Sequence, residues 1–240
     1  MSKVPASVVR VWLDAFVLDA FLTSVGQDIE QKTPDVTALS DAGPRRIPAG
    51  YDHKDSFVGF FDGAQYSVDE VLDALRGSSS DHYVCKLFEG ATPGKTAYET
   101  VALMSSEPRA ARLGEAIGLS LDLTGSNSLS RGVLLLNQTV TSTVNGTGQD
   151  QGATTSGTEY QAVFRVFSGT FTSLTVKIQE SSDNGGSDPW ADIAGLSHTF
   201  TAAGVYRVST TAATERYKRA VVSAFTGTSA MVGATGGIVA

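Results

Sequence analysis

The segment RRIPAGYDHKDSFVGFFDG, residues 45–63, decides the expected fold of this chain. Two arginines lead into a Pro-Gly bend, and polar and apolar residues then roughly alternate up to a Gly-Phe-Phe-Asp-Gly corner. A period of two is typical of a β-strand with one buried face. Nothing in the segment has the spacing of an active site, so it indicates pairing with other strands rather than chemistry.

Short alternating runs recur along the whole chain. In AIGLSLDL (116–123), four apolar residues fall on one face: Ile117, Leu119, Leu121 and Leu123. The other runs are VVRVWL (8–13), HYVCKLF (82–88), YETVALM (98–104), YQAVFRVF (160–167), SLTVKIQE (173–180), VYRVST (205–210) and YKRAVVSAF (217–225). FSGTFTS (167–173) and FTGTSAM (225–231) are alike and are interpreted as two similar hairpin turns. The pattern predicts an antiparallel β-sandwich or barrel.

A single helix is predicted over residues 67–76, SVDEVLDALR. Ser67 and Glu70 have the spacing of a capping box, and Gly77 supplies a stop signal. The apolar residues between them recur at helical spacing and form one stripe. The expected fold class is therefore mainly β, with one short helix packed on a sheet.

A polar run, TSTVNGTGQDQGATTSGT (141–158), suggests a division of the chain. We expect a β-sandwich domain over residues 1–145, a linker or loop over 146–158, and a β-rich C-terminal domain over 159–240. The alternative is that both halves interleave in one large sandwich, which 240 residues permit.

The composition excludes several classes of protein. No run approaches the 18 apolar residues of a membrane span, and the first residues do not read as an export signal, so we expect a soluble chain without a membrane anchor. The one cysteine, Cys85, excludes an internal disulfide. Acids outnumber bases by 25 to 18, and residues 1–145 carry most of the excess, 18 acids against 12 bases. An acidic surface disfavours the binding of nucleic acid.

The motifs that suggest chemistry do not fit their functions. GATPGKT (90–96) is one residue short of a phosphate-binding loop, and it is better explained as a type II turn with Pro93 and Gly94 at its centre. His82 and Cys85 would point to opposite faces of a strand, without a second pair of metal ligands nearby. We therefore predict no catalytic, cofactor-binding or metal-binding residues and no enzyme activity.

The N-terminal third of the sequence resembles the tail tube proteins of long-tailed bacterial viruses. These sequences share an aspartate shortly before a Φ-L-x-S-V segment, a strand leading to D-V-T, and a loop that runs through an arginine and I-P-G into a G-F-F-D-type strand. The matching residues here are Asp19, Leu22, Ser24, Val25, Asp35, Val36, Thr37, Arg46, Ile47, Pro48, Gly50, Gly59, Phe60 and Asp62. Ala49 is inserted between Pro48 and Gly50, which departs from the family pattern. The predicted helix falls where this family has its helix.

The resemblance implies a structural virion protein. Subunits of this family are β-sandwiches that close into six-membered rings, and the rings stack into a hollow tube that conducts the genome. It implies identical subunits and other tail proteins as partners, DNA as cargo rather than ligand, and no cofactor. It also implies a place in the host cytoplasm before assembly and in the virion tail afterwards. The alternative is a virion decoration or tail-tip module whose C-terminal domain binds a capsid or a cell surface.

Within this reading, residues 25–50 are expected to form an extended hairpin that faces the lumen. Asp28, Glu30, Asp35 and Asp41 would supply negative charge that repels DNA phosphates. The alternative is that these acids lie on an ordinary solvated face. Arg45 and Arg46 are candidates for contacts between subunits, with a solvated loop as the alternative.

Overall fold

The computed structural model describes residues 5–38, 42–47, 51–61, 68–75, 81–113, 115–126 and 129–239, and it divides the chain into two compact units. Unit 1 comprises Met1–Ala20, Tyr83–Thr100 and Leu129–Ala240, and unit 2 comprises Phe21–His82 and Val101–Ser128. Strand pairing is antiparallel throughout, and the described residues contain one α-helix. The predicted mainly β fold class is confirmed.

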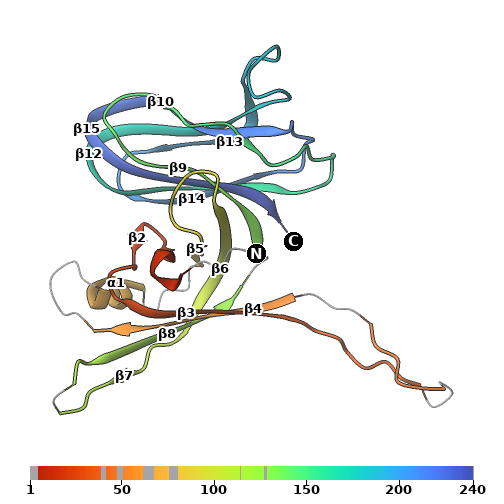
Figure 1. Ribbon diagram of the computed structural model, residues 1–240, viewed down its shortest axis with the longest axis vertical. Coiled ribbons are helices and arrows are strands. Elements are labelled where there is room, and N and C mark those ends of the chain that lie inside the picture. The colour runs from red at the N-terminus through yellow and green to blue at the C-terminus, as the bar shows by residue number, and fades with distance from the viewer. Residues whose placement is uncertain are drawn as a thin grey trace. The chain divides into compact units, whose positions relative to one another are not determined.

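Unit 1 contains most of the strands (Figure 1). Its sheet has the order β13-β12-β15-β9-β6-β5-β1-β2, with β14 also pairing β12, and β10 and β11 pairing β15. The bounds are β1 Arg10–Leu13, β2 Phe16–Val17, β5 His82–Leu87, β6 Thr96–Ser106, β9 Ser130–Val140, β10 Val144–Asn145, β11 Gln149–Asp150, β12 Tyr160–Ser181, β13 Ala191–Phe200, β14 Gly204–Thr210 and β15 Tyr217–Val239. A three-residue 3-10 helix, Ala6–Val8, precedes β1.

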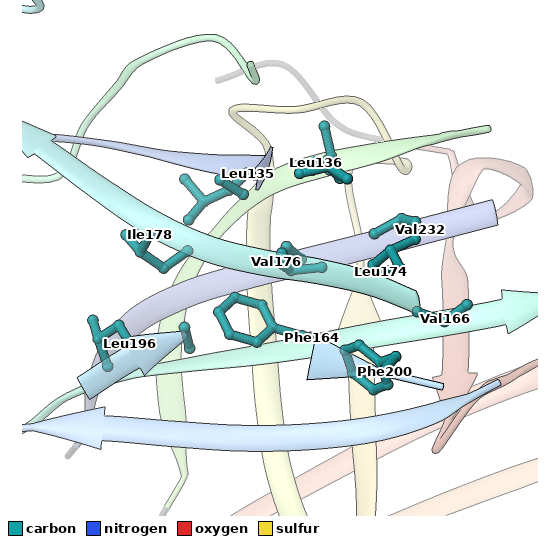
Figure 2. Close-up of a cluster of buried hydrophobic side chains, with 14 of the residues drawn as sticks. Leu135, Leu136, Phe164, Val166, Leu174, Val176, Ile178, Leu196, Phe200 and Val232 are labelled. Carbon is teal, nitrogen blue, oxygen red and sulfur yellow. The ribbon is translucent and has the colours of Figure 1, made fainter. Parts of the chain in front are cut away.

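A large apolar cluster fills the space enclosed by β9, β12, β13 and β15 (Figure 2). Phe164, Leu174, Val176 and Leu196 are fully buried in it. Leu174 and Val176 alternate with polar residues along β12, which is why the sequence shows a period of two there. Burial of such side chains contributes roughly 1.5–3 kcal/mol each, so this cluster is the main source of the stability of unit 1.

The two runs interpreted as hairpin turns are not turns. FSGTFTS lies in the middle of β12 and FTGTSAM in the middle of β15, where they pair with each other through several β-bulges. Small residues are needed here because the backbones approach closely: a Cβ on Gly227 would lie 2.5 Å from Phe171 Cα. The bulges bend both strands locally, and this explains the turn-like composition.

The polar segment 146–158 is attached to β15 in unit 1. β11 pairs with Lys218 and Tyr217, and Thr154 forms a bridge with Thr214. The side chain of Lys218 donates a hydrogen bond to Gly152 O at 2.6 Å. Unit 1 contains residues from both sides of this segment. Whether residues 1–145 and 159–240 form separately stable parts stays a prediction, and limited proteolysis tests it.

The type II turn is confirmed. Lys95 N donates to Thr92 O at 3.2 Å, and Gly94 has a φ of +91°.

Cys85 lies fully buried in a second apolar cluster with Trp12 and Leu134, and burial raises the pKa of its thiol.

Unit 2 is a smaller sheet of β3 Leu22–Gln31, β4 Tyr51–Phe60 and β8 Gly118–Gly125, with β7 Arg109–Ala110 and the end of β6 on the far edge of β8. The helix α1, Val68–Leu75, lies within the predicted 67–76. Its predicted cap at Ser67 and its stop at Gly77 fall outside the described residues. Arg109 ion-pairs with Asp69 of α1 at 2.6 Å and so ties the helix to β7.

A pH effect is expected at His198 in unit 1. Its ring stacks on Tyr206 at 3.5 Å, and partial burial lowers its pKa below the ordinary value. The pKa of His198 is therefore lower in the folded chain than in the unfolded chain. At a pH between these two values the unfolded chain binds more protons than the folded chain, so stability is lost as the pH falls below about 6.5. The melting temperatures of wild type and His198→Gln, measured from pH 7.5 down to 5, test this. The wild type should lose more stability on acidification, and equal losses would contradict the assignment.

Candidate functional site

The candidate site lies on the long hairpin of β3 and β4 in unit 2. Its register runs from Leu22 opposite Gly59 to Gln31 opposite Tyr51. Pairing continues further out, where Asp35 bridges Arg46. β8 accompanies β4 only as far as Lys54, so the hairpin extends past the rest of the sheet (Figure 1). The expected extended hairpin over residues 25–50 is therefore present in its described part.

The sheet of β3, β4 and β8 has two chemically different faces. The odd-numbered residues form the buried face, where Phe57, Leu121 and Leu123 are almost fully covered. The even-numbered residues form the open face, on which Lys54 is exposed and Asp122 is partly exposed. Paired residues in adjacent strands lie on the same face, so the register shows to which face of the sheet each side chain belongs.

The open face carries a net negative charge. Asp28 lies opposite Lys54, Glu30 lies opposite Asp52, and Asp122 of β8 lies on the same face. Lys32, just beyond β3, ion-pairs with Asp52 at 3.0 Å. With four acidic and two basic side chains, this face has a net charge of −2. The hydrogen bond and charge of Lys32 lower the pKa of Asp52, so this carboxylate remains ionised under mildly acidic conditions.

The other predicted residues lie further out on the hairpin. Asp35 accepts hydrogen bonds from Thr37 Oγ1 and from Thr37 N at 2.9 Å, and these bonds lower its pKa. Arg45 N donates to Thr37 Oγ1 at 2.8 Å, which places Arg45 and Arg46 opposite Asp35 and Thr37. Asp41 lies outside the described residues. The structure thus brings Asp28 and Glu30 together, and separately Asp35 with the two arginines.

Two acidic residues of the open face could not be identified from the sequence. Asp52 and Asp122 join Asp28 and Glu30 only through strand register, which the sequence does not reveal. The alternation of YDHKDSF was the available signal: it places Asp52 and Lys54 on the same side of β4.

Exposed apolar side chains lie at both ends of the hairpin sheet. Ile29 and Tyr51, towards the tip, are 43% and 63% exposed. Val58 and Phe60, at the base, are 44% and 52% exposed.

Both edges of this sheet are open to further pairing in the part of unit 2 that is described. β3 pairs there only with β4, along ten residues that contain neither lysine nor proline. On the opposite side, β7 and the end of β6 pair with β8. Long unprotected edges invite pairing with another chain.

The described residues offer no arrangement typical of catalysis. Among them, no group of three or more His, Cys, Asp or Glu side chains could hold a metal ion. Within the same residues, no helix has the length and hydrophobicity required to cross a bilayer.

Comparison with known proteins gives similarity at the level of solved structures. No protein-family model matches the sequence, and no curated protein does. A chain from the virion of a native gene transfer agent particle is 17% identical, with a TM-score of 0.44, covering 54% of this chain and 98% of that chain. The SPP1 tail tube protein is 9% identical over 54% of this chain and 78% of that chain, with a TM-score of 0.43. The SPP1 Dit protein, described as a paradigm of the hub adsorption apparatus in phages that infect Gram-positive bacteria, is 12% identical over 95% of this chain and 99% of that chain, with a TM-score of 0.37.

The resemblance to tail tube proteins noted in the sequence thus recurs among solved structures. Because identities are 9–17% and TM-scores are below 0.5, we take the function from the residues of this chain.

Proposed function

We propose that this protein is a structural subunit of a phage tail tube, and that identical copies form stacked rings around a channel for the genome. The observation that carries the proposal is the open face of unit 2, which is net negative and lies on a sheet with two unpaired edges. The sequence resemblance points the same way. Other tail proteins would bind at the tube ends, and assembly would precede incorporation into the virion.

Strand directions support closure of a ring. β3 and β8 run one way, and β4, β6 and β7 run the other way, since every pairing is antiparallel. Rotation about an axis along the strands preserves direction, so β3 of one copy would meet β6 and β7 of the next copy in antiparallel orientation. The interface is heterologous, and a heterologous interface that closes gives a ring.

The width of the sheet supports six copies. Four strands at a spacing of about 4.8 Å give about 19 Å per copy, so six copies give a circumference of about 115 Å and a diameter of about 37 Å. That leaves room for a DNA duplex after side chains are added. Three copies give a diameter of only about 18 Å, which is too narrow.

The charge of the open face suits a channel rather than a binding groove. DNA affinity rises with the number of phosphates that Lys and Arg neutralise. A wall with a charge of −2 per copy repels phosphates, so DNA passes without stable contacts.

Electron microscopy and sedimentation velocity of the full chain at high concentration test the proposal. We expect rings with the mass of six chains, together with hollow polymers. A chain that stays monomeric and binds glycans would instead support a decoration or tail-tip module.

The arginine pair gives a further test of assembly. Arg45 and Arg46 are exposed at the outer hairpin, and we infer that they contact a neighbouring copy. Reversal of both charges, Arg45→Glu with Arg46→Glu, should shorten polymers or prevent polymerisation. The matched control is Arg112→Glu with Lys95→Glu, which makes the same charge change elsewhere. Unchanged polymer length in the hairpin variant would place the pair in a solvated loop.

A further inference from the structure

We propose that residues 144–154 form a pH-sensitive strap, which closes over the side chain of Lys218 and covers one edge of β15. The strap comprises β10, β11 and the residues up to Thr154, and all of it lies in unit 1. Its behaviour does not depend on the proposed ring, so the two proposals can fail separately.

The strap covers a sheet edge that would otherwise be open. Along its N-terminal part, β15 pairs with β12 on one side and with β10 and β11 on the other side. The residues that pair with the strap run from Tyr217 to Val222. When the strap opens, this edge is exposed and can pair with another strand.

The strap is held by short pairings, whereas β12 and β15 pair along most of their length. β10 and β11 each pair with β15 through two residues, and Thr154 forms an isolated bridge with Thr214. The backbone hydrogen bonds include Gln151 N to Arg216 O at 3.1 Å and Thr154 N to Thr214 O at 2.9 Å. Segments with short pairings open at a lower free energy than core strands, so the strap can open while the rest of unit 1 stays folded.

Lys218 is buried beneath the closed strap. The residue has no exposed surface, and its Nζ donates to Gly152 O at 2.6 Å. The ammonium lies 5.3 Å from the centre of the Tyr160 ring, whose hydroxyl donates to Gln151 Oε1 at 3.2 Å. The strap therefore supplies one wall around the ammonium, and its closure removes water from a charged group.

Three acidic side chains lie near Lys218. Glu180 is opposite it on β12, Asp150 belongs to β11, and Glu215 precedes β15. Asp150 is ion-paired with Arg216 at 2.6 Å, and Glu180 Oε2 accepts a hydrogen bond from Glu215 N at 2.7 Å. Loss of water lowers the pKa of Lys218 from 10.5 to about 8, although the attraction of the three acids opposes this change.

The proton on Lys218 opposes closure of the strap, because burial of an ammonium is unfavourable. In the open form the amine is in water and has its ordinary pKa, so between about pH 8 and 10.5 the open form binds more protons than the closed form. Raising the pH through this range favours closure, and this gain is lost as the pH falls towards 8. Two-state linkage gives an open form that is about ten times less populated at pH 9 than at pH 7.

Amide hydrogen exchange of the full chain, with rates corrected for their intrinsic pH dependence, tests the strap. In the wild type, the protection factors of the Gln151 and Thr154 amides should rise about ten-fold from pH 7 to pH 9. Lys218→Met has a side chain of similar length that cannot ionise, so its protection factors should not change. Asp14 N, which donates to Tyr83 O at 2.8 Å elsewhere in unit 1, is the internal reference and should not change in either protein.

Lys177→Met is the matched control, because it removes a lysine of β12 that ion-pairs with Asp192 at 2.6 Å. Its strap should respond to pH as the wild type does. A wild-type strap that does not respond, or a Lys218→Met strap that still responds, would overturn the proposal. A rise at Asp14 as large as that at the strap would show opening of the whole unit and would also overturn it. Circular dichroism checks folding, and Lys218→Gln replaces Lys218→Met if that variant does not fold.

Discussion

Arg165→Met is expected to destabilise unit 1 by about 3–5 kcal/mol, because it leaves the Glu99 carboxylate buried without its cationic partner. Arg165 has no exposed surface, and its Nη1 and Nη2 donate to Glu99 Oε1 and Oε2 at 2.7 and 2.8 Å. Its Nε donates to Asp14 O at 2.9 Å, which fixes the β1–β2 turn. One side chain of β12 therefore holds both β6 and the β1–β2 turn.

The double variant Arg165→Met with Glu99→Met separates the ion pair from its surroundings. Replacing both partners by apolar side chains is often close to neutral, so the double variant should be more stable than Arg165→Met alone. Urea unfolding measures both. Arg216→Met is the matched control, because its ion pair with Asp150 at 2.6 Å is exposed and should be worth less than about 1 kcal/mol. An Arg165→Met effect as small as that of the control would contradict the role assigned to the buried pair.

The second large effect is expected on the passage of DNA. Asp28→Lys with Glu30→Lys changes the open face of each copy from −2 to −2 + 4 = +2. Tubes of this variant should retain DNA at about 50 mM salt and release much of it by about 200 mM, since phosphate contacts depend steeply on salt. Wild-type tubes should retain little under either condition.

Nuclease protection locates the retained DNA. Glu89→Lys with Glu215→Lys makes the same charge change at exposed positions of unit 1 and is the matched control. DNA held in the channel resists nuclease, and DNA bound outside does not. If the control protects as much DNA as the hairpin variant, the open face does not line the channel.

The strand pattern could be predicted from the sequence because it depends on local alternation, whereas the hairpin over residues 25–50 was expected from the family resemblance. The buried leucines of β8 and the turn at Pro93–Gly94 are examples, since each depends on neighbouring residues only. The helix could be predicted for the same reason, because its apolar residues recur at helical spacing within one segment.

The rest depends on pairing between distant segments. The −2 charge of the open face combines residues from β3, β4 and β8, and only the register shows that Asp122 shares a face with Glu30. The small residues of FSGTFTS and FTGTSAM resemble turn residues, yet here they allow close approach of two long strands. The polar segment 146–158 resembles a linker, yet its backbone pairs with β15.

A density map of the assembled polymer tests the central claim most directly, because it shows which face of the β3–β4–β8 sheet borders the channel. We predict a six-membered ring with Asp28, Glu30, Asp52 and Asp122 on the channel wall. A map that places these four carboxylates on the outer surface, or a channel lined by lysine and arginine, would contradict the proposal.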